Sequence, residues 1–338
     1  YWDLETIGVK DDETSARCSY EDYTKHLTMR NGKYVASMPW KEDYPPLSSN
    51  FSKCAGRTRA LVKRLDHHTL MMYHSILKEQ EERGFIERVK STDVNTGAGH
   101  YIPHHAVYKD SATTPIRIVY DCSCKTPEGT SLNDCLEVGP NLTNDLVEIL
   151  LRFRVHPIGL VSDIEKAFLN IELKDEDRDF TKFLWLSDPD DPNSGFVTYR
   201  FKAVLFGSAS SPFILNAVLK NHLEKSPSKV TEDLLSDIYV DNIVGGAPNE
   251  ETATKKYRQS IDILQEGGFN LRSWASNKKK IQEIAKEDGK LDPDLPKVKV
   301  LGMYWDTEED SLGYKQQPQD PIAVTKREVV RDTSTLFD

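Results

Sequence analysis

The most informative pattern in the chain is a pair of apolar runs on either side of a short polar segment. Residues 238–246 (IYVDNIVGG) place Asp241 and Asn242 between two β-rich halves, which predicts a hairpin with its polar tip at the turn. A second apolar run, 158–162 (IGLVS), leads directly into Asp163. Two strand-borne carboxylates can meet at one sheet edge, and a two-metal phosphoryl-transfer site needs that arrangement. An Asp-Asn pair between strands is also typical of an ordinary turn, so the hairpin alone leaves both interpretations open.

The first 120 residues predict an irregular entry followed by a helix and two strands. Residues 1–50 mix acidic clusters with Pro39 and the pair Pro45-Pro46, which indicates an irregular, partly extended lead-in. Apolar positions at helical spacing occur within residues 61–89 and predict a helix there, with its end near Gly84. Residues 105–108 and 116–120 predict two strands separated by a polar turn.

The remaining elements alternate between helices and strands. In order, we expect a helix over 144–153 capped by Thr143, the strand ending at Asp163, a helix from about Glu165, a hairpin of 180–185 and 196–201, a helix over 210–225, a hairpin over 235–247, a helix over 250–265 ended by Gly267 and Gly268, and a strand over 298–305. This order predicts an α+β fold in which helices cover one face of a sheet.

Composition places the chain among ordinary globular proteins. Its 338 residues are 29% charged and 38% hydrophobic, which predicts one large or two to three smaller subdomains. No run of 18 apolar residues occurs, so we expect no membrane partner. The chain has neither an initiator Met nor a signal-peptide pattern and ends abruptly at Asp338, so we expect a segment of a longer polypeptide.

The five cysteines are odd in number and scattered, which indicates reduced thiols in an intracellular protein. Cys122, Cys124 and Cys135 also suggest a zinc site, but their spacing is not C-x₂-C and no histidine pair follows. Free thiols are therefore the favoured interpretation.

The net charge of −10 argues against a protein that simply coats nucleic acid. Charge is unevenly distributed, because residues 53–64 contain five bases and no acid: Lys53, Arg57, Arg59, Lys63 and Arg64. A polymerase can be acidic overall and still line its template groove with bases, since only the local field acts on phosphates. A solvated helix face explains this segment equally well.

Five segments, in order, resemble the motifs of reverse transcriptases. Residues 161–168 (VSDIEKAF) resemble motif A, 205–213 (LFGSASSPF) resemble motif B, and 239–242 (YVDN) resemble the Tyr-x-Asp-Asp box. Residues 300–305 (VLGMYW) resemble the primer-grip strand, and 117–121 (RIVYD) resemble the fingers strand that meets the incoming triphosphate. The resemblance spans nearly the whole chain, and the five motifs are specific only in combination.

Finer features are similar to BEL/Pao retrotransposons: the start at 1–5 (YWDLE), the segment 268–277 (GFNLRSWASN) and the end at 325–338. The resemblance implies a right-hand polymerase fold with fingers and a palm, in which helices back an antiparallel sheet and the thumb is partial or missing. The implied domains are a lead-in from an upstream polyprotein (1–50), a fingers-like region (51–135), a palm with a fingers insertion near 174–202 (136–310), and the truncated start of a thumb or connection (311–338).

The same resemblance implies that Asp163 and Asp241 hold two Mg²⁺ ions, or Mn²⁺, with the carbonyl of Ile164 as an extra ligand. In such a site one ion activates the primer 3′-hydroxyl, and the other neutralises the triphosphate and the leaving pyrophosphate. Asp163 can also be explained as the N-cap of a helix that begins near Glu165.

By resemblance, five further positions contact the nucleotide. Arg117 would clamp the triphosphate with help from Lys109, whose match to the family is weaker; the alternative for both is an exposed position with no such role. Phe168 stands where the family places the steric gate that favours dNTPs, and its alternative is a core phenylalanine. Phe206 and Gly207 would let the backbone approach the nucleotide, because glycine has no Cβ.

Tyr239 would pack near the primer terminus, with an ordinary strand tyrosine as the alternative. A cationic general acid for pyrophosphate is expected near Arg272 or Lys278–Lys280. The primer grip would include Gly302, Met303 and Tyr304.

Asn242 departs from the family pattern, which normally ends the box with a second Asp. An Asn carbonyl is a neutral and weaker ligand, so we expect impaired Mg²⁺-dependent synthesis that is partly recovered in Mn²⁺ or by Asn242→Asp. The alternative is that polymerases of this lineage are fully active with Asn at this position. In that case the native protein and the Asn242→Asp variant extend primers at equal rates.

The leading hypothesis is an RNA-directed and DNA-directed DNA polymerase of a retrotransposon. It would use an RNA or DNA template with primer and dNTPs, together with the protease, RNase H and integrase of its polyprotein, inside a cytoplasmic virus-like particle. One alternative is a catalytically dead, domesticated nucleic-acid-binding relic, which Asn242 and the acidic net charge favour. Another is an RNA-dependent RNA polymerase, against which Phe168 and Gly207 argue.

Overall fold

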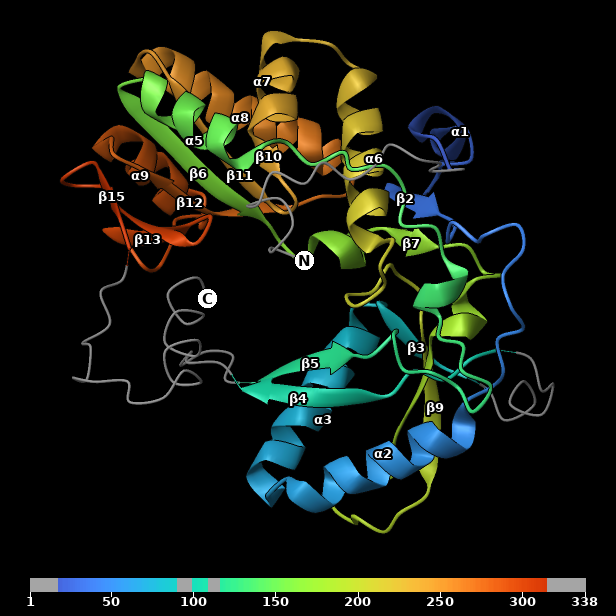
Figure 1. Ribbon diagram of the computed structural model, residues 1–338. Helices are drawn as coiled ribbons and strands as arrows, with labels where there is room; N and C mark the ends of the chain where they lie inside the picture. Colours follow the sequence, from blue (N-terminus) through green and yellow to red (C-terminus); the bar gives the residue numbers. More distant parts are fainter. Residues whose placement is uncertain (1–17, 90–98, 109–115, 315–338) are drawn as a thin grey trace, which may run out of the picture. The chain divides into compact units, whose positions relative to one another are not determined.

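A computed structural model describes residues 18–89, 99–108 and 116–314 of the chain (Figure 1). The chain divides into two compact units: unit 1 consists of Tyr1–Leu142 and Phe168–Val218, and unit 2 of Thr143–Ala167 and Leu219–Asp338. Helix α6 (Ser211–Glu224) begins in unit 1 and ends in unit 2. The mixture of helices and sheets confirms the expected α+β class, and the assignment of fingers, palm and thumb stays a prediction.

The described residues of unit 1 form three small sheets and two long helices, α2 and α3. Its strands pair in the orders β1-β2-β7, β3-β9-β8 and β4-β5. The elements are α1 (Tyr20–Thr24), β1 (Thr28–Arg30), β2 (Lys33–Ala36), α2 (Phe51–Arg64), α3 (His67–Glu82), β3 (Ile86–Arg88), β4 (His104–Tyr108), β5 (Ile116–Tyr120), η2 (Asn133–Cys135), η3 (Ala167–Asn170, at the boundary), β7 (Glu172–Leu173), η4 (Arg178–Thr181), β8 (Lys182–Leu186) and β9 (Phe196–Phe201).

Two expectations for the N-terminal half are wrong in detail. The lead-in contains regular structure over its described part, because the Ser19 hydroxyl caps α1 and β1 pairs with β2 in a hairpin. The single helix expected over 61–89 is two helices, since Oδ1 of Asp66 accepts a hydrogen bond from the Thr69 amide at 2.8 Å and starts α3. The two hairpins, β4–β5 and β8–β9, are confirmed.

A buried histidine organises the core of unit 1. Nε2 of His104 bonds the Leu184 carbonyl at 2.8 Å, and Nδ1 bonds the Tyr73 hydroxyl. The Tyr73 ring also stacks on Trp185 with centroids 4.4 Å apart. Burial lowers the pKa of His104 to about 4, so the ring is neutral at pH 7. A neutral imidazole has one donor and one acceptor, and this site uses both.

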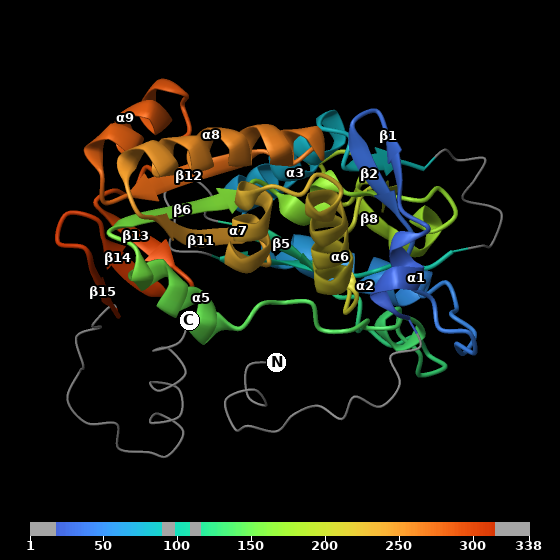
Figure 2. The same ribbon diagram turned by 90° about the horizontal axis from the view of Figure 1, so that it is seen from above.

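Unit 2 is built on a four-stranded antiparallel sheet of order β10-β11-β6-β12. A second sheet of order β13-β14-β15 accompanies it. Figure 2 shows α8 along one side of the larger sheet and α5 on the other. The elements are α5 (Leu146–Val155), β6 (Ile158–Ile164), α7 (Lys229–Asp237), β10 (Ile238–Tyr239), β11 (Asn242–Ala247), α8 (Glu250–Glu266), β12 (Leu271–Ser276), α9 (Lys279–Glu287), β13 (Lys297–Val300), β14 (Met303–Asp306) and β15 (Ser311–Gly313).

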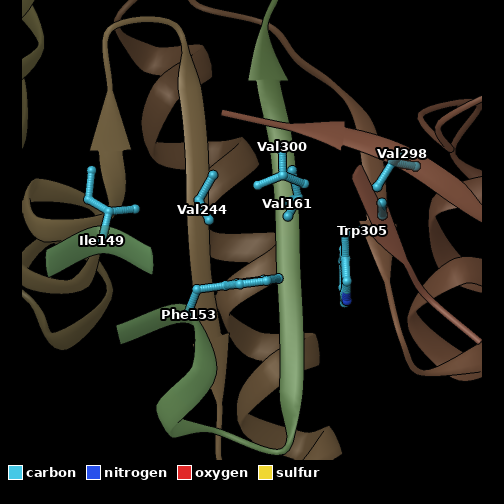
Figure 3. Packing of buried hydrophobic residues seen from close by; sticks show 8 residues of the cluster. Ile149, Phe153, Val161, Val244, Val298, Val300 and Trp305 are labelled. Carbon is cyan, nitrogen blue, oxygen red and sulfur yellow. The ribbon is translucent and has the colours of Figure 1, made fainter. Parts of the chain in front are cut away.

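The core of unit 2 fixes the middle of β6. Val161 of β6 lies opposite Val244 of β11, and α5 and the β13–β14 hairpin pack over this pair (Figure 3). Gly159 is needed here because a Cβ would lie 2.8 Å from the Trp305 ring and 2.9 Å from the Phe153 ring. The cluster comprises Ile149, Phe153, Val161, Val244, Ala275, Val298, Val300 and Trp305. Burial of this apolar surface holds β6 in a single register on the sheet.

The structure corrects the expected caps around β6. Asp145, not Thr143, caps α5, because its Oδ1 accepts the Glu148 amide hydrogen at 2.9 Å. Asp163 belongs to β6, and the following segment forms only the short 3₁₀ helix η3, so the N-cap explanation of Asp163 is wrong.

Two hairpins of unit 2 differ from the prediction. In β10–β11, Tyr239 pairs with Asn242, so Val240 and Asp241 form the turn and Asn242 starts the second strand. The strand expected over 298–305 is the β13–β14 hairpin, because both turn residues, Leu301 and Gly302, adopt positive φ. Helix α7 was also missed, and it ends immediately before β10.

Within the described residues, no helix combines the length and apolar character that crossing a bilayer requires. The five cysteines are free thiols, and all except Cys18 are buried.

Candidate active site

The backbone brings Asp163 and Asp241 to the same end of the large sheet in unit 2. Asp163 is the penultimate residue of β6, and its register partner on β11 is Asn242. The Ile164 amide donates a hydrogen bond to the Asp241 carbonyl at 2.7 Å, which ties the hairpin turn to β6. The juxtaposition expected from two separate sequence segments is therefore present in the structure.

A polar row crosses three neighbouring strands at this end. Asp163 on the central strand β6 has Asn242 of β11 on one side and Arg272 of β12 on the other. Residues opposite one another in a ladder place their side chains on the same face of the sheet. Asp163 is two residues beyond Val161, so this row shares its face with the apolar core of unit 2.

The polar row is linked by specific hydrogen bonds. Nδ2 of Asn242 donates to Oδ1 of Asp241 at 3.0 Å. Nε and Nη2 of Arg272 both donate to Oδ2 of Asp163 at 3.2 Å. The other oxygen of Asp163, Oδ1, is buried and makes no hydrogen bond to the described residues. A buried carboxylate oxygen is costly without a partner, so this atom is the clearest ligand-seeking group of the row.

The residues present fit a Mg²⁺ site. Carboxylate and carbonyl oxygens are the ligands that Mg²⁺ prefers, and it completes its shell with water and substrate phosphates. Asp163, Asp241 and the carbonyl of Ile164 supply such oxygens within one short stretch of sheet. Across the described ranges, no group of three or more His, Cys, Asp or Glu side chains is placed to hold a metal. A metal here would therefore depend on water and substrate for its remaining ligands.

Val240 occupies an unusual backbone conformation in the hairpin turn. Its φ is +55°, a region that β-branched residues rarely adopt. A two-residue hairpin turn demands a positive φ at its first position, so the tight connection of β10 to β11 imposes this strain. The turn thereby places Asp241 beside the end of β6, as its bond from the Ile164 amide shows.

The predicted primer-grip residues lie on the β13–β14 hairpin of unit 2. Gly302 is exposed in the turn at a φ of +86°, and Met303 and Tyr304 begin β14 half-buried. Tyr239 and the turn residue Leu301 both pack against the apolar core of unit 2. The structure thus gives Tyr239 a packing role, and its contact with a primer stays a prediction.

Three of the predicted nucleotide-binding residues lie together in unit 1. The rings of Phe168 and Phe206 meet edge to face with centroids 4.5 Å apart. Phe168 is 5% exposed and Phe206 is 47% exposed, so the pair presents one ring to solvent. Gly207 has a φ of +105°, and a Cβ there would overlap the Tyr120 carbonyl oxygen. Glycine is required at this point for a close approach to the strand that also carries Arg117.

Arg117 is exposed on β5, opposite Val107. Lys109, its predicted helper, lies outside the described residues.

Asn133 holds the loop that carries the predicted site residue Gly207, and sequence reasoning missed it. Its Nδ2 donates to the Gly207 carbonyl at 3.2 Å and to Oγ of Ser123 at 2.8 Å, while its Oδ1 accepts from the Ala209 amide at 2.9 Å. These bonds hold the 207–209 loop from both sides. No local pattern marks Asn133, because its partners Gly207 and Ala209 are 74 and 76 residues away in sequence and become neighbours only in the fold.

Within the predicted cationic region, Arg272 lies beside Asp163, and the choice of the general acid stays a prediction. Arg272 forms an ion pair with Asp163, whereas Lys279 and Lys280 are exposed in the first turn of α9. Within the described residues, Cys122, Cys124 and Cys135 do not gather with one another or with other His, Cys, Asp or Glu side chains in a group of three that could hold a metal.

Comparison of the sequence with protein-family models and with curated proteins finds no match. Solved structures do match. The dRH form of the foamy viral protease-reverse transcriptase bound to double-stranded DNA has a TM-score of 0.54 at 16% identity, over 78% of this chain and 39% of its own. The foamy viral protease-reverse transcriptase with double-stranded DNA has a TM-score of 0.52 at 14% identity, over 79% of this chain and 46% of its own. The same protein in complex with an RNA/DNA hybrid has a TM-score of 0.53 at 13% identity, over 94% of this chain and 36% of its own.

These similarities define the fold. The chain has a retroviral-type reverse transcriptase fold, as the ordered motifs predicted, at a sequence identity too low to carry more than the fold. It spans less than half the length of each of these structures.

Proposed function

We propose that this chain is the polymerase module of a reverse transcriptase, which adds deoxynucleotides to a primer 3′-hydroxyl on an RNA or DNA template. One observation carries the proposal: within a reverse transcriptase fold, Asp163 at the end of β6 and Asp241 in the β10–β11 turn lie at one end of the sheet, and Asp163 presents a buried oxygen with no partner among the described residues. The foamy viral structures were solved with double-stranded DNA or an RNA/DNA hybrid, which supports nucleic acid as the partner class.

In this proposal Asp163 and Asp241 hold two Mg²⁺ ions, with Mn²⁺ as a substitute and the Ile164 carbonyl as an added ligand. When bound, the ions activate the primer 3′-hydroxyl and neutralise the triphosphate. Asn242 keeps the Asp241 carboxylate oriented through its 3.0 Å hydrogen bond. Arg272, released from Asp163, is positioned on the same sheet end for the negative charge of the phosphates.

The residues of unit 1 select and position the nucleotide. Phe168, braced by the Phe206 ring, excludes a 2′-hydroxyl and so favours dNTPs. Gly207 leaves the backbone accessible, and Arg117, with Lys109, pairs with the triphosphate. Gly302, Met303 and Tyr304 with Tyr239 position the primer terminus.

We assign the module to a BEL/Pao-type retrotransposon polyprotein. Protease, RNase H and integrase would then be its companions, and a cytoplasmic virus-like particle its place of action. The basis is the sequence resemblance at 268–277, where Arg272 and the β12 strand lie.

The test is primer extension on a poly(rA)-type template in Mg²⁺ and in Mn²⁺. We expect slow extension in Mg²⁺, faster extension in Mn²⁺ and a gain with Asn242→Asp, because a second anionic ligand strengthens the metal site. Asp163→Ala should abolish extension, whereas Asp262→Ala, on the exposed face of α8, should leave it unchanged. Competition between dNTPs and rNTPs distinguishes a DNA polymerase from an RNA polymerase. Equal rates for Asp163→Ala and the native protein would contradict the proposal.

A non-catalytic nucleic-acid-binding relic is the second candidate. The Asn242 amide and the Arg272–Asp163 ion pair favour it, because both place neutral or positive groups where a metal would bind. Salt-dependent binding of primer-template without extension in either metal, and without recovery by Asn242→Asp, would establish this candidate instead.

A further inference from the structure

Helix α2 of unit 1 has one buried face and one basic face. Its buried side chains pack into unit 1: Cys54, Ala55, Thr58, Leu61 and Val62. Lys53, Arg59, Lys63 and Arg64 are all exposed. At 100° per residue, the buried positions cover one side of the helix and these four cations lie on the other. The basic run of the sequence therefore forms a single continuous surface, which we call the α2 basic face (Lys53, Arg59, Lys63 and Arg64).

The cations of the α2 basic face have no carboxylate partner among the described residues. Nζ of Lys53 donates to the Lys125 carbonyl at 2.6 Å, and Nε of Arg64 donates to the Ala60 carbonyl at 3.1 Å. The Arg59 guanidinium lies 5.1 Å from the centroid of the Phe196 ring. Arg57, on the edge of this face, is different, because its Nη1 lies 2.6 Å from Oδ2 of Asp121.

This lack of carboxylate partners is unusual in a chain with a net charge of −10. On the next helix, α3, both Lys78 and the nearby Arg83 lie within 4.0 Å of glutamates of the same helix. Four like charges on one helix face repel one another at helical spacing, so they are unfavourable for the isolated fold. Such a surface is stabilised when a polyanion neutralises it.

The dimensions of the α2 basic face suit a phosphate backbone. Lys53 and Arg64 are eleven residues apart, which corresponds to about 16 Å along a helix. One nucleic-acid strand has a phosphate about every 3.4 Å along a duplex axis, so about four phosphates fit this length. Gly56 and Ala60 are exposed between the cations, and a Cβ at Gly56 would meet no atom within 4 Å. Small residues there let a strand lie close to the helix.

We propose that the α2 basic face of unit 1 binds the phosphate backbone of a nucleic acid, in addition to any contact made by the polar row of unit 2. An anionic membrane fits less well, because interfacial helices insert large apolar side chains, and this face offers Gly56 and Ala60 instead. A second copy of the chain would bring like charge against like charge. Nucleic acid is the polyanion that the surface accommodates by charge and by length.

The experiment compares two triple variants of equal charge change. The test variant is K53Q/R59Q/K63Q, and the control is K255Q/R258Q/K286Q, which removes two lysines and one arginine from exposed positions of α8 and α9. Both are made in an Asp163→Ala background, so binding is measured without turnover. Fluorescence anisotropy of labelled 20-nucleotide RNA and DNA, single-stranded and as a hybrid, is followed between 50 and 200 mM salt.

We expect the test variant to bind roughly tenfold more weakly at about 100 mM salt, with a salt slope smaller by about 2, because each phosphate contact releases counterions. The control should stay within about twofold of the parent. The charge-preserving variant K53R/R59K/K63R should bind like the parent, which assigns the weaker binding of the test variant to its lost charges. RNA and DNA arms identify the strand type.

Equal affinity and equal slope for the test and control variants would overturn the proposal. Loss of binding to phosphatidylserine vesicles, with nucleic-acid binding unchanged, would overturn it in favour of a membrane. Because turnover is absent in all arms, these outcomes are separate from those of the extension assay. If the native protein extends primers, and the α2 substitutions leave nucleic-acid binding unchanged in the Asp163→Ala background, this proposal is refuted and the proposed function is not.

Discussion

Replacing Asn242 by Asp should destabilise the metal-free protein and strengthen its response to metal. The substitution removes the amide that donates to Asp241 at 3.0 Å and places a third carboxylate opposite Asp163. Facing side chains in a ladder have Cβ atoms about 5 Å apart. Two unit charges at that distance repel by about 3 kcal/mol at an effective dielectric constant of 20 and by about 0.8 kcal/mol in water.

The net effect lies near the lower end of this range. The Asp163 side chain is 31% exposed, and Arg272 on its other side offsets part of the repulsion. We expect the free energy of unfolding in EDTA to fall by about 1–2 kcal/mol from charge, plus about 1 kcal/mol from the lost hydrogen bond. For a chain of this size, this corresponds to a melting temperature lower by several degrees.

The assay is thermal unfolding in EDTA and in increasing Mn²⁺ or Mg²⁺. The added carboxylate reverses its effect once a dication is bound, so Asn242→Asp should gain more stability from metal than the native chain does. Asn242→Ala is the matched control, because it loses the same hydrogen bond without adding charge. If Asn242→Asp and Asn242→Ala melt alike in EDTA and respond alike to metal, the charge argument is wrong.

Three further predictions concern other contacts. Arg272→Met removes the cation from Asp163, so the protein without nucleic acid should bind Mn²⁺ about 3–10-fold more tightly; Arg272→Lys should not, and weaker binding by Arg272→Met would contradict the expectation. Gly245→Ala drives a Cβ into Oδ2 of Asp237, which bonds a buried lysine, and should lower the free energy of unfolding by about 2–4 kcal/mol in urea titrations; an unchanged midpoint would count against this packing. Desolvation lowers the pKa of His104 from 6.5 to about 4 in the folded protein, so the unfolded chain binds a proton first. Stability should therefore fall as pH drops from 6.5 to 4, by roughly 3 kcal/mol at the lower end, and urea unfolding of His104→Asn should lack this part of the pH dependence.

Local patterns gave most of the elements, because periodicity depends on neighbouring residues. The alternation that predicted the strand ending at Asp163 and the hairpin around Asp241 corresponds to β6 and β10–β11. Errors occurred where two local preferences compete. Asp66 restarts a helix that periodicity alone continues, and Gly302 folds back a strand that periodicity alone extends.

The candidate site was predicted only in part. That Asp163 and Asp241 lie at strand ends could be read from the residues flanking them. The contacts of the predicted site residues could not be predicted. Arg272, the partner of Asp163, is 109 residues from it in the chain, and Asn133, the partner of Gly207, is 74 residues from it. No short-range pattern relates residues at such separations.

The sequence by itself determined the order of the strands and helices, the two aspartates of the sheet end and the departure at Asn242. Only the tertiary structure decided the register that sets Asn242 against Asp163, and the ion pair that Arg272 makes there. The physical reason is that register depends on burial. α5 and the β13–β14 hairpin cover Val161 and its neighbours, and a slip of one residue would turn that apolar face to water.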